Sequence, residues 1–465
     1  MRIFFLIVLL PFFVVAAGCQ GNLQKDITNS DTLSPANPNV DDFRTRIAQP
    51  EISAKERSQG TSTPEAEPVL AIVNGAIIDG TGAAPIVGGT IIIQGDKIVA
   101  VGETSTVSIP NQATVVDVAD FTVLPGIINS HVHFTFDPLT RHNFLLEGVT
   151  AVCDLGTSLR CLSNFDRDCT LENQPAARGF KAGPMITVPH GYPGTFRNYC
   201  WHYPVDTPAA ARLAVEDLLE QGVDVIKISL EPGRPCQPWP VLTPAQVQII
   251  ADTAHARGKL VRAHVRQAAM LARALDAGVD VIEHTPLPFC METELQMACQ
   301  QGTLSLQCQP AFKAQLDRMA AQKVVLVPTL TPHTWAINEL PGLTPAERTA
   351  AINFSLEIIS YFRSAGGEVA LGNDYGNPGA NERMPLREME LLRQAGLTPM
   401  DVIVAGTKHA AYVSGHGHEL GTLEPGKLAD MIVVAGNPLA DIEAMRNVVI
   451  VIKEGQIIYI TNLAA

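Results

Sequence analysis

The sequence has few basic residues for its length. Its 33 Lys and Arg residues are outnumbered by 47 Asp and Glu residues, which gives a formal net charge of −14 and a pI near 5.3. Nucleic acids and anionic lipid surfaces are bound through basic patches that displace counterions. The composition therefore argues against nucleic acid as a partner and favours small molecules or short peptides.

The first residues lack an apolar run long enough to span a bilayer, which takes about 20 residues. The apolar stretch from Ile3 to Val15 follows Arg2 and precedes the small residues 16–18 and Cys19, so residues 1–19 have the pattern of an export signal. From residue 20 to 68 the chain is polar and poor in aromatics, so we expect a disordered tether there.

The segment Ala-Ala-Gly-Cys at the end of this signal resembles the lipobox of bacterial lipoproteins. The resemblance implies cleavage before Cys19 and acylation of its thiol, and several acyl chains would make a stable membrane anchor. Gln20, in place of an aspartate, favours the outer over the inner membrane. We therefore expect a lipid-anchored protein of the bacterial cell envelope that faces the periplasm, with an ordinary cleaved signal peptide as the alternative.

No CxxC motif is present, although eight cysteines remain after Cys19. The absence argues against a zinc site made of thiolates. An exported chain meets oxidising conditions that permit disulfides, but their connectivity cannot be read from the sequence.

Short β-type runs separated by Gly, Asn and Asp turns occur towards both ends of the chain. One set lies within residues 69–125 and the other within residues 421–463. We expect the two sets to form one small β-sandwich domain assembled from both chain ends.

Between residues 126 and 420, short apolar β-type segments alternate with helical ones, as in βα units around a parallel sheet. Eight segments of the β type end near Asn129, Asp154, Thr187, Ser229, Ala263, Glu283, Val327 and Gly372. The pattern predicts an α/β fold with a (β/α)8 TIM barrel. A doubly wound open sheet is the alternative, but the first segment lacks the GxGxxG turn that a nucleotide would need.

Six potential metal ligands stand at the expected ends of these strands. His131 and His133 follow the apolar run from Val123 to Ile128, and side chains two residues apart on a strand point to the same side. The other four are Lys227, His264, His284 and Asp374. Because the carboxyl ends of barrel strands meet at one mouth, we expect all six to lie together.

The six residues also have structural interpretations. A histidine at a strand end is more often a hydrogen-bonded structural residue, and Lys227 alone could be a surface ion-pair partner. Six such residues at equivalent positions make that interpretation a poor one. His416 and His418 repeat the spacing, but glycines flank them and no apolar strand precedes them, which predicts a solvated loop.

In this order the motifs resemble the amidohydrolase superfamily, and specifically its imidazolonepropionase-like and prolidase-like metal-dependent hydrolases. The motifs lie at residues 124–133, 225–228, 262–265, 282–285, 372–375 (in place of the usual Gly-Thr-Asp) and 421–430. The resemblance extends over about residues 68–460 and implies two divalent metal ions, expected to be zinc.

The resemblance also assigns roles to residues. It implies that His131, His133 and Asp374 hold one metal, that His264 and His284 hold the other, and that carboxylated Lys227 bridges them. A carbamate supplies anionic oxygens where an ammonium group would repel cations. A metal-bridging hydroxide would attack the polarised carbonyl, and Asp374 would carry the proton to the departing amine.

Three residues after the third expected strand face the same mouth. From the family we expect His190 to be a catalytic oxyanion contact, Tyr192 to bind substrate and Arg197 to hold a substrate carboxylate.

The sequence thus predicts a binuclear amidohydrolase that cleaves a C–N bond in a dipeptide, an N-acyl amino acid or a cyclic amide. A lactonase or phosphotriesterase-like hydrolase could use the same site, and a non-catalytic ligand-binding lipoprotein is the alternative from another class. A homo-oligomer is compatible with the sequence.

Overall fold

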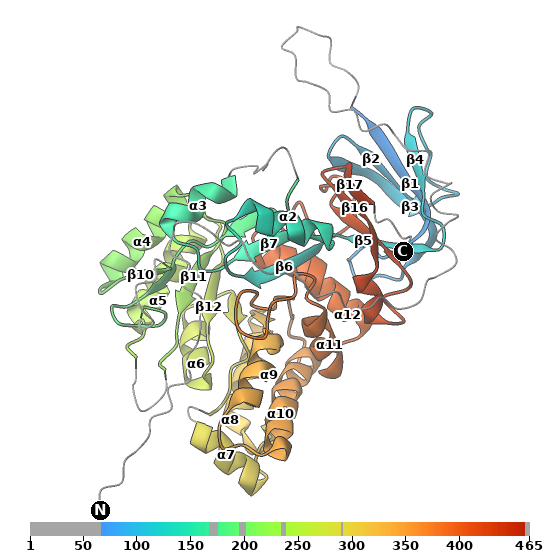
Figure 1. The fold of residues 1–465 in the computed structure, drawn as a ribbon. Coiled ribbons are helices and arrows are strands. Elements are labelled where there is room, and N and C mark those ends of the chain that lie inside the picture. Colours follow the sequence, from blue (N-terminus) through green and yellow to red (C-terminus); the bar gives the residue numbers. More distant parts are fainter. Residues whose placement is uncertain (1–66, 167–174, 195–200, 234–238, 290–291, 461–465) are drawn as a thin grey trace, which may run out of the picture.

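The computed structural model describes residues 67–166, 175–194, 201–233, 239–289 and 292–460. It has two parts, a larger region of strands and helices and a smaller region of strands alone (Figure 1). Cys19, most of the expected tether and Arg197 lie outside the described residues. Among the described residues, no helix combines the length and the apolar character needed to cross a membrane.

The smaller region is one eight-stranded sheet that joins the two ends of the chain. Its strand order is β17-β16-β15-β5-β1-β2-β3, with β4 also paired to β1. The pairing of β15 with β5 places Met431 opposite Pro125 and so connects distant parts of the sequence. Both halves of this sheet contribute to one apolar core, which explains why neither chain end could form the domain alone. The strands are β1 (Val69–Ile77), β2 (Ile86–Gln94), β3 (Lys97–Glu103), β4 (Thr114–Asp117), β5 (Phe121–Pro125), β15 (Met431–Ala435), β16 (Val448–Lys453) and β17 (Gln456–Ile460).

The larger region is built on parallel strands that do not close into one continuous ladder. They form a three-stranded sheet, β6-β7-β8, and a six-stranded sheet, β10-β9-β11-β12-β13-β14. The strands are β6 (Ile127–Val132), β7 (Val149–Asp154), β8 (Arg178–Lys181), β9 (Met185–Thr187), β10 (His202–Pro204), β11 (Ile226–Ser229), β12 (Val261–His264), β13 (Val281–Glu283) and β14 (Val325–Val327).

The expected eighth strand, ending near Gly372, is not a regular strand. The segment still bridges its neighbours, because Ala370 N donates to Leu326 O at 2.9 Å and Ser130 N donates to Leu371 O at 3.0 Å. A side chain at Gly372 would come within 2.6 Å of His131 Cβ, so the backbone passes close to β6 at this point. The close approach closes the gap between the two sheets with single hydrogen bonds in place of a ladder.

Helices alternate with the parallel strands, as the sequence predicts. Several begin at a Thr-Pro pair, with the threonine side chain accepting from the backbone N–H three residues on, as in the capping boxes at Thr243, Thr344 and Thr398. The helices are α2 (Pro138–Leu146), α3 (Leu159–Asp166), α4 (Pro208–Glu220), α5 (Pro244–His255), α6 (Ala268–Asp276), α7 (Glu292–Gln301), α8 (Pro310–Ala321), α9 (Leu330–Glu339), α10 (Pro345–Ser364), α11 (Leu386–Gln394), α12 (Pro399–Val404) and α13 (Ala410–Val413).

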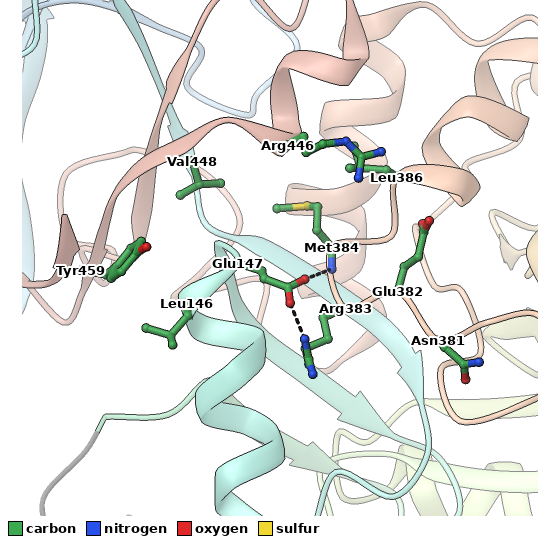
Figure 2. A pocket seen from close by; sticks show the side chains of 10 residues that line it. All are labelled: Leu146, Glu147, Asn381, Glu382, Arg383, Met384, Leu386, Arg446, Val448 and Tyr459. Carbon is green, nitrogen blue, oxygen red and sulfur yellow. Dashed lines mark hydrogen bonds and ion pairs between the residues drawn. The ribbon is translucent and has the colours of Figure 1, made fainter. Parts of the chain in front are cut away.

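A cavity of about 450 Å³ lies where the two regions meet (Figure 2). The Glu147 carboxylate, just after α2, forms an ion pair with Arg383 and accepts a hydrogen bond from Met384 N at 3.3 Å. Val448 and Tyr459 line the cavity from the sheet region. None of the six expected ligands lines this cavity, so it is separate from the predicted metal site.

Candidate metal centre

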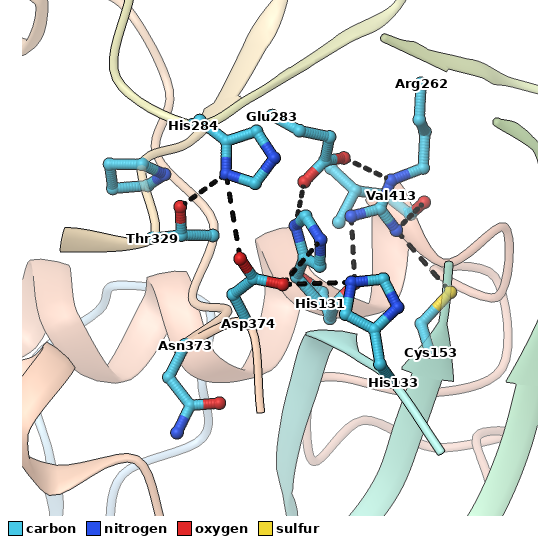
Figure 3. A network of polar contacts seen from close by, with 12 residues as sticks. His131, His133, Cys153, Arg262, Glu283, His284, Thr329, Asn373, Asp374 and Val413 are labelled. Atoms are coloured by element: carbon cyan, nitrogen blue, oxygen red, sulfur yellow. Dashed lines mark hydrogen bonds and ion pairs between the residues drawn. The ribbon is translucent and has the colours of Figure 1, made fainter. Parts of the chain in front are cut away.

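His131, on β6, and His133, directly after it, meet Asp374 at the carboxyl end of the strand (Figure 3). The Nε2 atoms of His131 and His133 lie 3.3 Å and 3.0 Å from the same Oδ1 of Asp374. One ligand atom of each of these residues lies within 4.8 Å of the others, which is a suitable arrangement for a metal ion. Asp374 has a left-handed φ of 58° and also accepts a hydrogen bond from Asn377 Nδ2 at 2.8 Å.

The charge states of this group suit a cation. Burial and the nearby Lys227 lower the pKa of His131 to about 4, so its imidazole is neutral and keeps a lone pair at neutral pH. Burial alone would raise the pKa of Asp374, but His131 and His133 hold it below its usual range overall. A neutral imidazole beside an ionised carboxylate offers the donor atoms that a divalent cation requires.

A second pair of histidines faces the first. The rings of His264, at the end of β12, and His284, just after β13, lie 4.3 Å apart, and the rings of His284 and His131 lie 5.1 Å apart. Burial lowers the pKa of His264 to about 4 and that of His284 well below its usual value. Asp374 Oδ2 lies 4.0 Å from His284 Nδ1, so this carboxylate lies between the two histidine pairs.

Lys227 lies on β11 and is fully buried, which excludes the interpretation of a surface ion pair. Its Nζ has no hydrogen-bond partner among the described residues. Burial lowers the pKa of this amine to about 8. An amine of that pKa has an accessible neutral form with a lone pair, and a buried polar atom without a partner is costly, so both observations fit an amine completed by another group.

A buried ion pair behind the histidines was not predicted. Arg262 Nε donates to Glu283 Oε1 at 2.6 Å, and Glu283 Oε2 lies 2.6 Å from His131 Nδ1. Burial alone would raise the pKa of Glu283, but Arg262 and Lys227 lower it overall, so the carboxylate is ionised. A carboxylate on the far nitrogen of a histidine orients the ring and strengthens it as a ligand. A charged residue inside each of two otherwise apolar strands was the signal that could have revealed this pair.

The predicted substrate contacts are placed less uniformly. The Tyr192 ring lies 4.7 Å from the His264 ring and stacks on Trp239 at 5.8 Å, so it lies beside the centre. His190 is exposed with a φ of 64° and, within the described part of the chain, makes no hydrogen bond or ring contact with the histidines. Arg197 lies outside the described residues, so its expected role is a prediction only.

Arg266 is a further residue of the site that was not predicted from the sequence. Its charge acts on Tyr192, His264, His284 and Asp374, which places it at the same mouth. Its side chain is exposed, and its guanidinium has no hydrogen bond or ion pair with any residue that the structure describes. Its position two residues after His264, which is the spacing of the first histidine pair, was the available signal.

The prediction of a solvated loop for the second HxH motif is wrong for His416. Its Nε2 lies 2.8 Å from Asp224 Oδ1, its Nδ1 lies 2.7 Å from Glu419 Oε1, and its ring stacks on Phe180 at 3.9 Å. Asp224 precedes β11, so this cluster lies at the opposite end of the strand from the metal centre. Contacts between distant segments hold this imidazole half-buried despite the flanking glycines.

Comparisons with known proteins agree with this geometry. The model of the amidohydrolase family matches residues 122–458. Imidazolonepropionase from Geobacillus sp. (strain WCH70) is 25% identical over 392 residues, which cover 74% of this chain and 83% of the relative. Ochratoxinase from Aspergillus niger is 26% identical over 240 residues, which cover 50% of this chain and 45% of the relative.

Solved structures show the same fold. A Xaa-Pro dipeptidase with bound methionine superposes with a TM-score of 0.66 at 23% identity, covering 84% of this chain and 100% of the other. A putative prolidase from Bifidobacterium longum superposes with a TM-score of 0.66 at 26% identity, covering 85% of this chain and 95% of the other. These similarities support a TIM barrel combined with a β-rich domain, although the strands here leave the barrel ladder open.

Proposed function

Because the chain belongs to the amidohydrolase family and is a hydrolase of carbon–nitrogen bonds, we propose that it cleaves a small amide at a centre for two divalent cations. The observation that carries this proposal is the meeting, at one barrel mouth, of four histidines, Asp374 and a buried lysine without a partner among the described residues. The substrate class that we propose is a dipeptide or an N-acyl amino acid.

The residues fit such a centre. His131, His133 and Asp374 would hold one cation and His264 and His284 the other, with Lys227 carboxylated between them. Bound there, divalent cations would supply Lewis-acid chemistry that acidifies water and polarises a carbonyl. The fit is supported by the low pKa values of the buried imidazoles and by the lysine amine that has no partner among the described residues.

Asp374 is the group that we expect to move protons. Its carboxylate is ionised and lies between the two histidine pairs, where it can take a proton from the attacking water. Delivery of that proton to the departing nitrogen completes amide cleavage, because an amide anion is a poor leaving group. Asn377 holds Oδ1 by a hydrogen bond and so orients the carboxylate.

Arg266 supports a substrate that carries a carboxylate. An exposed guanidinium that has no partner within the described part of the chain, beside buried ligands, is free to form a charge-assisted pair with an anionic group. Tyr192 and Trp239 form an apolar wall next to it. A dipeptide or an N-acyl amino acid offers both an anion and an apolar side chain, whereas a simple lactone or cyclic amide does not. His190 as oxyanion contact and Arg197 as a further clamp remain part of the proposal.

Metal analysis combined with a hydrolysis panel tests the proposal. The full-length protein, supplied with zinc and bicarbonate, should bind two equivalents of zinc and hydrolyse dipeptides or N-acyl amino acids faster than lactones or phosphotriesters. Preference for the lactones or phosphotriesters would support the alternative hydrolase. A protein that stays metal-free would support the ligand-binding lipoprotein instead.

We also propose a lipid anchor at Cys19 in the cell envelope, supported by the sequence before it. The Cys19→Ser variant should appear in the soluble fraction while the wild type stays with membranes. A wild type that is itself soluble would contradict the anchor and leave the hydrolase proposal intact.

A further inference from the structure

Helix α9 begins in an unusual way. Its N-cap residue, Thr329, has φ 47° and ψ 52°, in the left-handed region, and its side chain makes no capping hydrogen bond. A β-branched residue rarely adopts this conformation, which costs about 1–3 kcal/mol. Four other helices have an N-cap threonine in extended conformation whose side chain accepts from the backbone, namely Thr207, Thr243, Thr344 and Thr398.

The missing cap of α9 comes from another helix. Glu388 lies on α11 and is fully buried. Its Oε1 accepts from Leu330 N at 2.7 Å, and its Oε2 accepts from Thr331 N and Thr331 Oγ1, each at 2.7 Å. Burial raises the pKa of Glu388 to about 7, so an ionisable group is kept here against a desolvation cost. Donors at the first turn of α9 offset that cost.

With the cap supplied by Glu388, the Thr329 hydroxyl is free for another contact. Its Oγ1 lies 2.8 Å from Nδ1 of His284 (Figure 3). His284 itself has a left-handed φ of 70°, so both partners are held in conformations that they would leave without support. An imidazole that donates Nδ1–H to this hydroxyl presents the lone pair of Nε2 to a cation.

We propose that Glu388 is a positioning residue, which caps α9 so that Thr329 can orient the metal ligand His284. Without Glu388, Thr329 would relax to the extended N-cap conformation, and its hydroxyl would bond the α9 backbone and leave His284. The inference rests on the proposed function, because it assigns His284 to a metal.

The test measures zinc affinity by chelator competition, with the melting temperature of the metal-free protein as a separate readout. Thr329→Val keeps the shape of the side chain but removes the hydroxyl, and should weaken zinc binding by about 10–100-fold. Thr329→Ser keeps the hydroxyl and should bind zinc like the wild type. The Glu388→Gln variant should weaken zinc binding to a similar extent, and the double variant Glu388→Gln/Thr329→Val should bind no more weakly than Thr329→Val alone.

A matched control is Glu347→Gln, in the exposed capping box of α10, which should leave zinc affinity unchanged. Equal zinc affinity of the Val and Ser variants at position 329 would overturn the inference, even if Glu388→Gln fails to fold. Glu388→Gln with wild-type affinity and only a lower melting temperature would also overturn it, because Glu388 would then be purely structural. A wild type that binds no zinc would remove the proposed function, and this inference with it.

Discussion

The chain contains two HxH pairs, and they lie in opposite environments. His131 is fully buried, its pKa is lowered to about 4, and it meets Asp374 and other histidines at the carboxyl ends of the strands. Burial alone would lower the pKa of His416, but its bonds to Asp224 and Glu419 raise it overall. One pair is thus prepared to bind a cation, whereas the surroundings of the other pair favour the protonated form of a histidine. Spacing brings two imidazoles together, but their surroundings decide which role they take.

The largest expected difference between the surroundings of the two HxH pairs concerns the aspartate beside each pair. Asp374→Asn should lower kcat by about 10²–10⁴-fold, because the amide cannot accept and return a proton, while the protein keeps its metal. Asp224→Asn, beside His416, is the matched control and should keep kcat near the wild-type value. Steady-state kinetics with metal analysis decides the outcome, and full turnover by Asp374→Asn would exclude the proton-carrier role.

The fully buried Lys227 and the half-buried Lys427 should differ next. Lys227→Ala should lower activity by about 10–100-fold, because the proposed anionic bridge between the two cations is removed. Added short carboxylic acids such as propionate should restore part of the activity. Lys427, whose Nζ donates to Gly417 O and Leu420 O beside the second HxH pair, has its partners already. Lys427→Ala should therefore show neither the loss nor the rescue, and an untreated Lys227→Ala enzyme with full activity would contradict carboxylation.

Arg266, at the same mouth as the first HxH pair, should affect the binding of substrates that carry a carboxylate. Arg266→Met should raise KM for N-acetylphenylalanine by about tenfold or more, the value of a charge-assisted hydrogen bond. KM for N-acetylphenethylamine, which has the same scissile amide without the carboxylate, should not change. Parallel KM measurements on both compounds give the answer. A similar rise for both would mean that Arg266 shapes the mouth without binding the anion.

The smallest expected effect is on the contribution of the second HxH pair to the stability of the protein. His416→Gln should lower the free energy of unfolding by about 1–2 kcal/mol at pH 6, since a charged hydrogen bond is lost. The folded-state pKa of His416 is raised, so its contribution is complete below the unfolded pKa of about 6.5 and is lost as the pH rises through the folded value. Urea unfolding between pH 6 and 9 should therefore show the difference shrinking.

The matched variant for this last test is His418→Gln, because His418 is exposed in the same motif. It should unfold like the wild type at every pH. If His416→Gln instead lowered zinc affinity, the division of roles between the two HxH pairs would be wrong.

Much of the fold could be predicted from local patterns. The alternation of apolar segments with helical ones depends on neighbouring residues, and so do helix starts at Thr-Pro pairs such as those of α5 and α10. The eighth strand was less predictable. Gly372 passes so close to His131 that regular pairing is replaced by single hydrogen bonds, and that approach depends on a residue far away in the sequence.

The site was predictable where a ligand ends a strand. His264 and His284 could be expected at one mouth, because parallel strands bring their carboxyl ends together. Arg262, Glu283 and Glu388 could not be assigned in the same way. Their roles depend on which group each one contacts in the folded chain. A charged residue in an apolar segment does not reveal from the sequence which residue it will pair with.

By itself, the sequence determined the order of strands and helices, the residues at the strand ends and the overall acidic charge, because these follow from local periodicity and composition. Only the tertiary structure decided that Lys227 is a buried amine without a hydrogen-bond partner among the described residues, that Thr329 contacts His284 and that the pKa of His416 is raised. The physical reason is that pKa values and hydrogen bonds depend on burial and on partners brought from distant segments. Those partners meet only when the chain has folded.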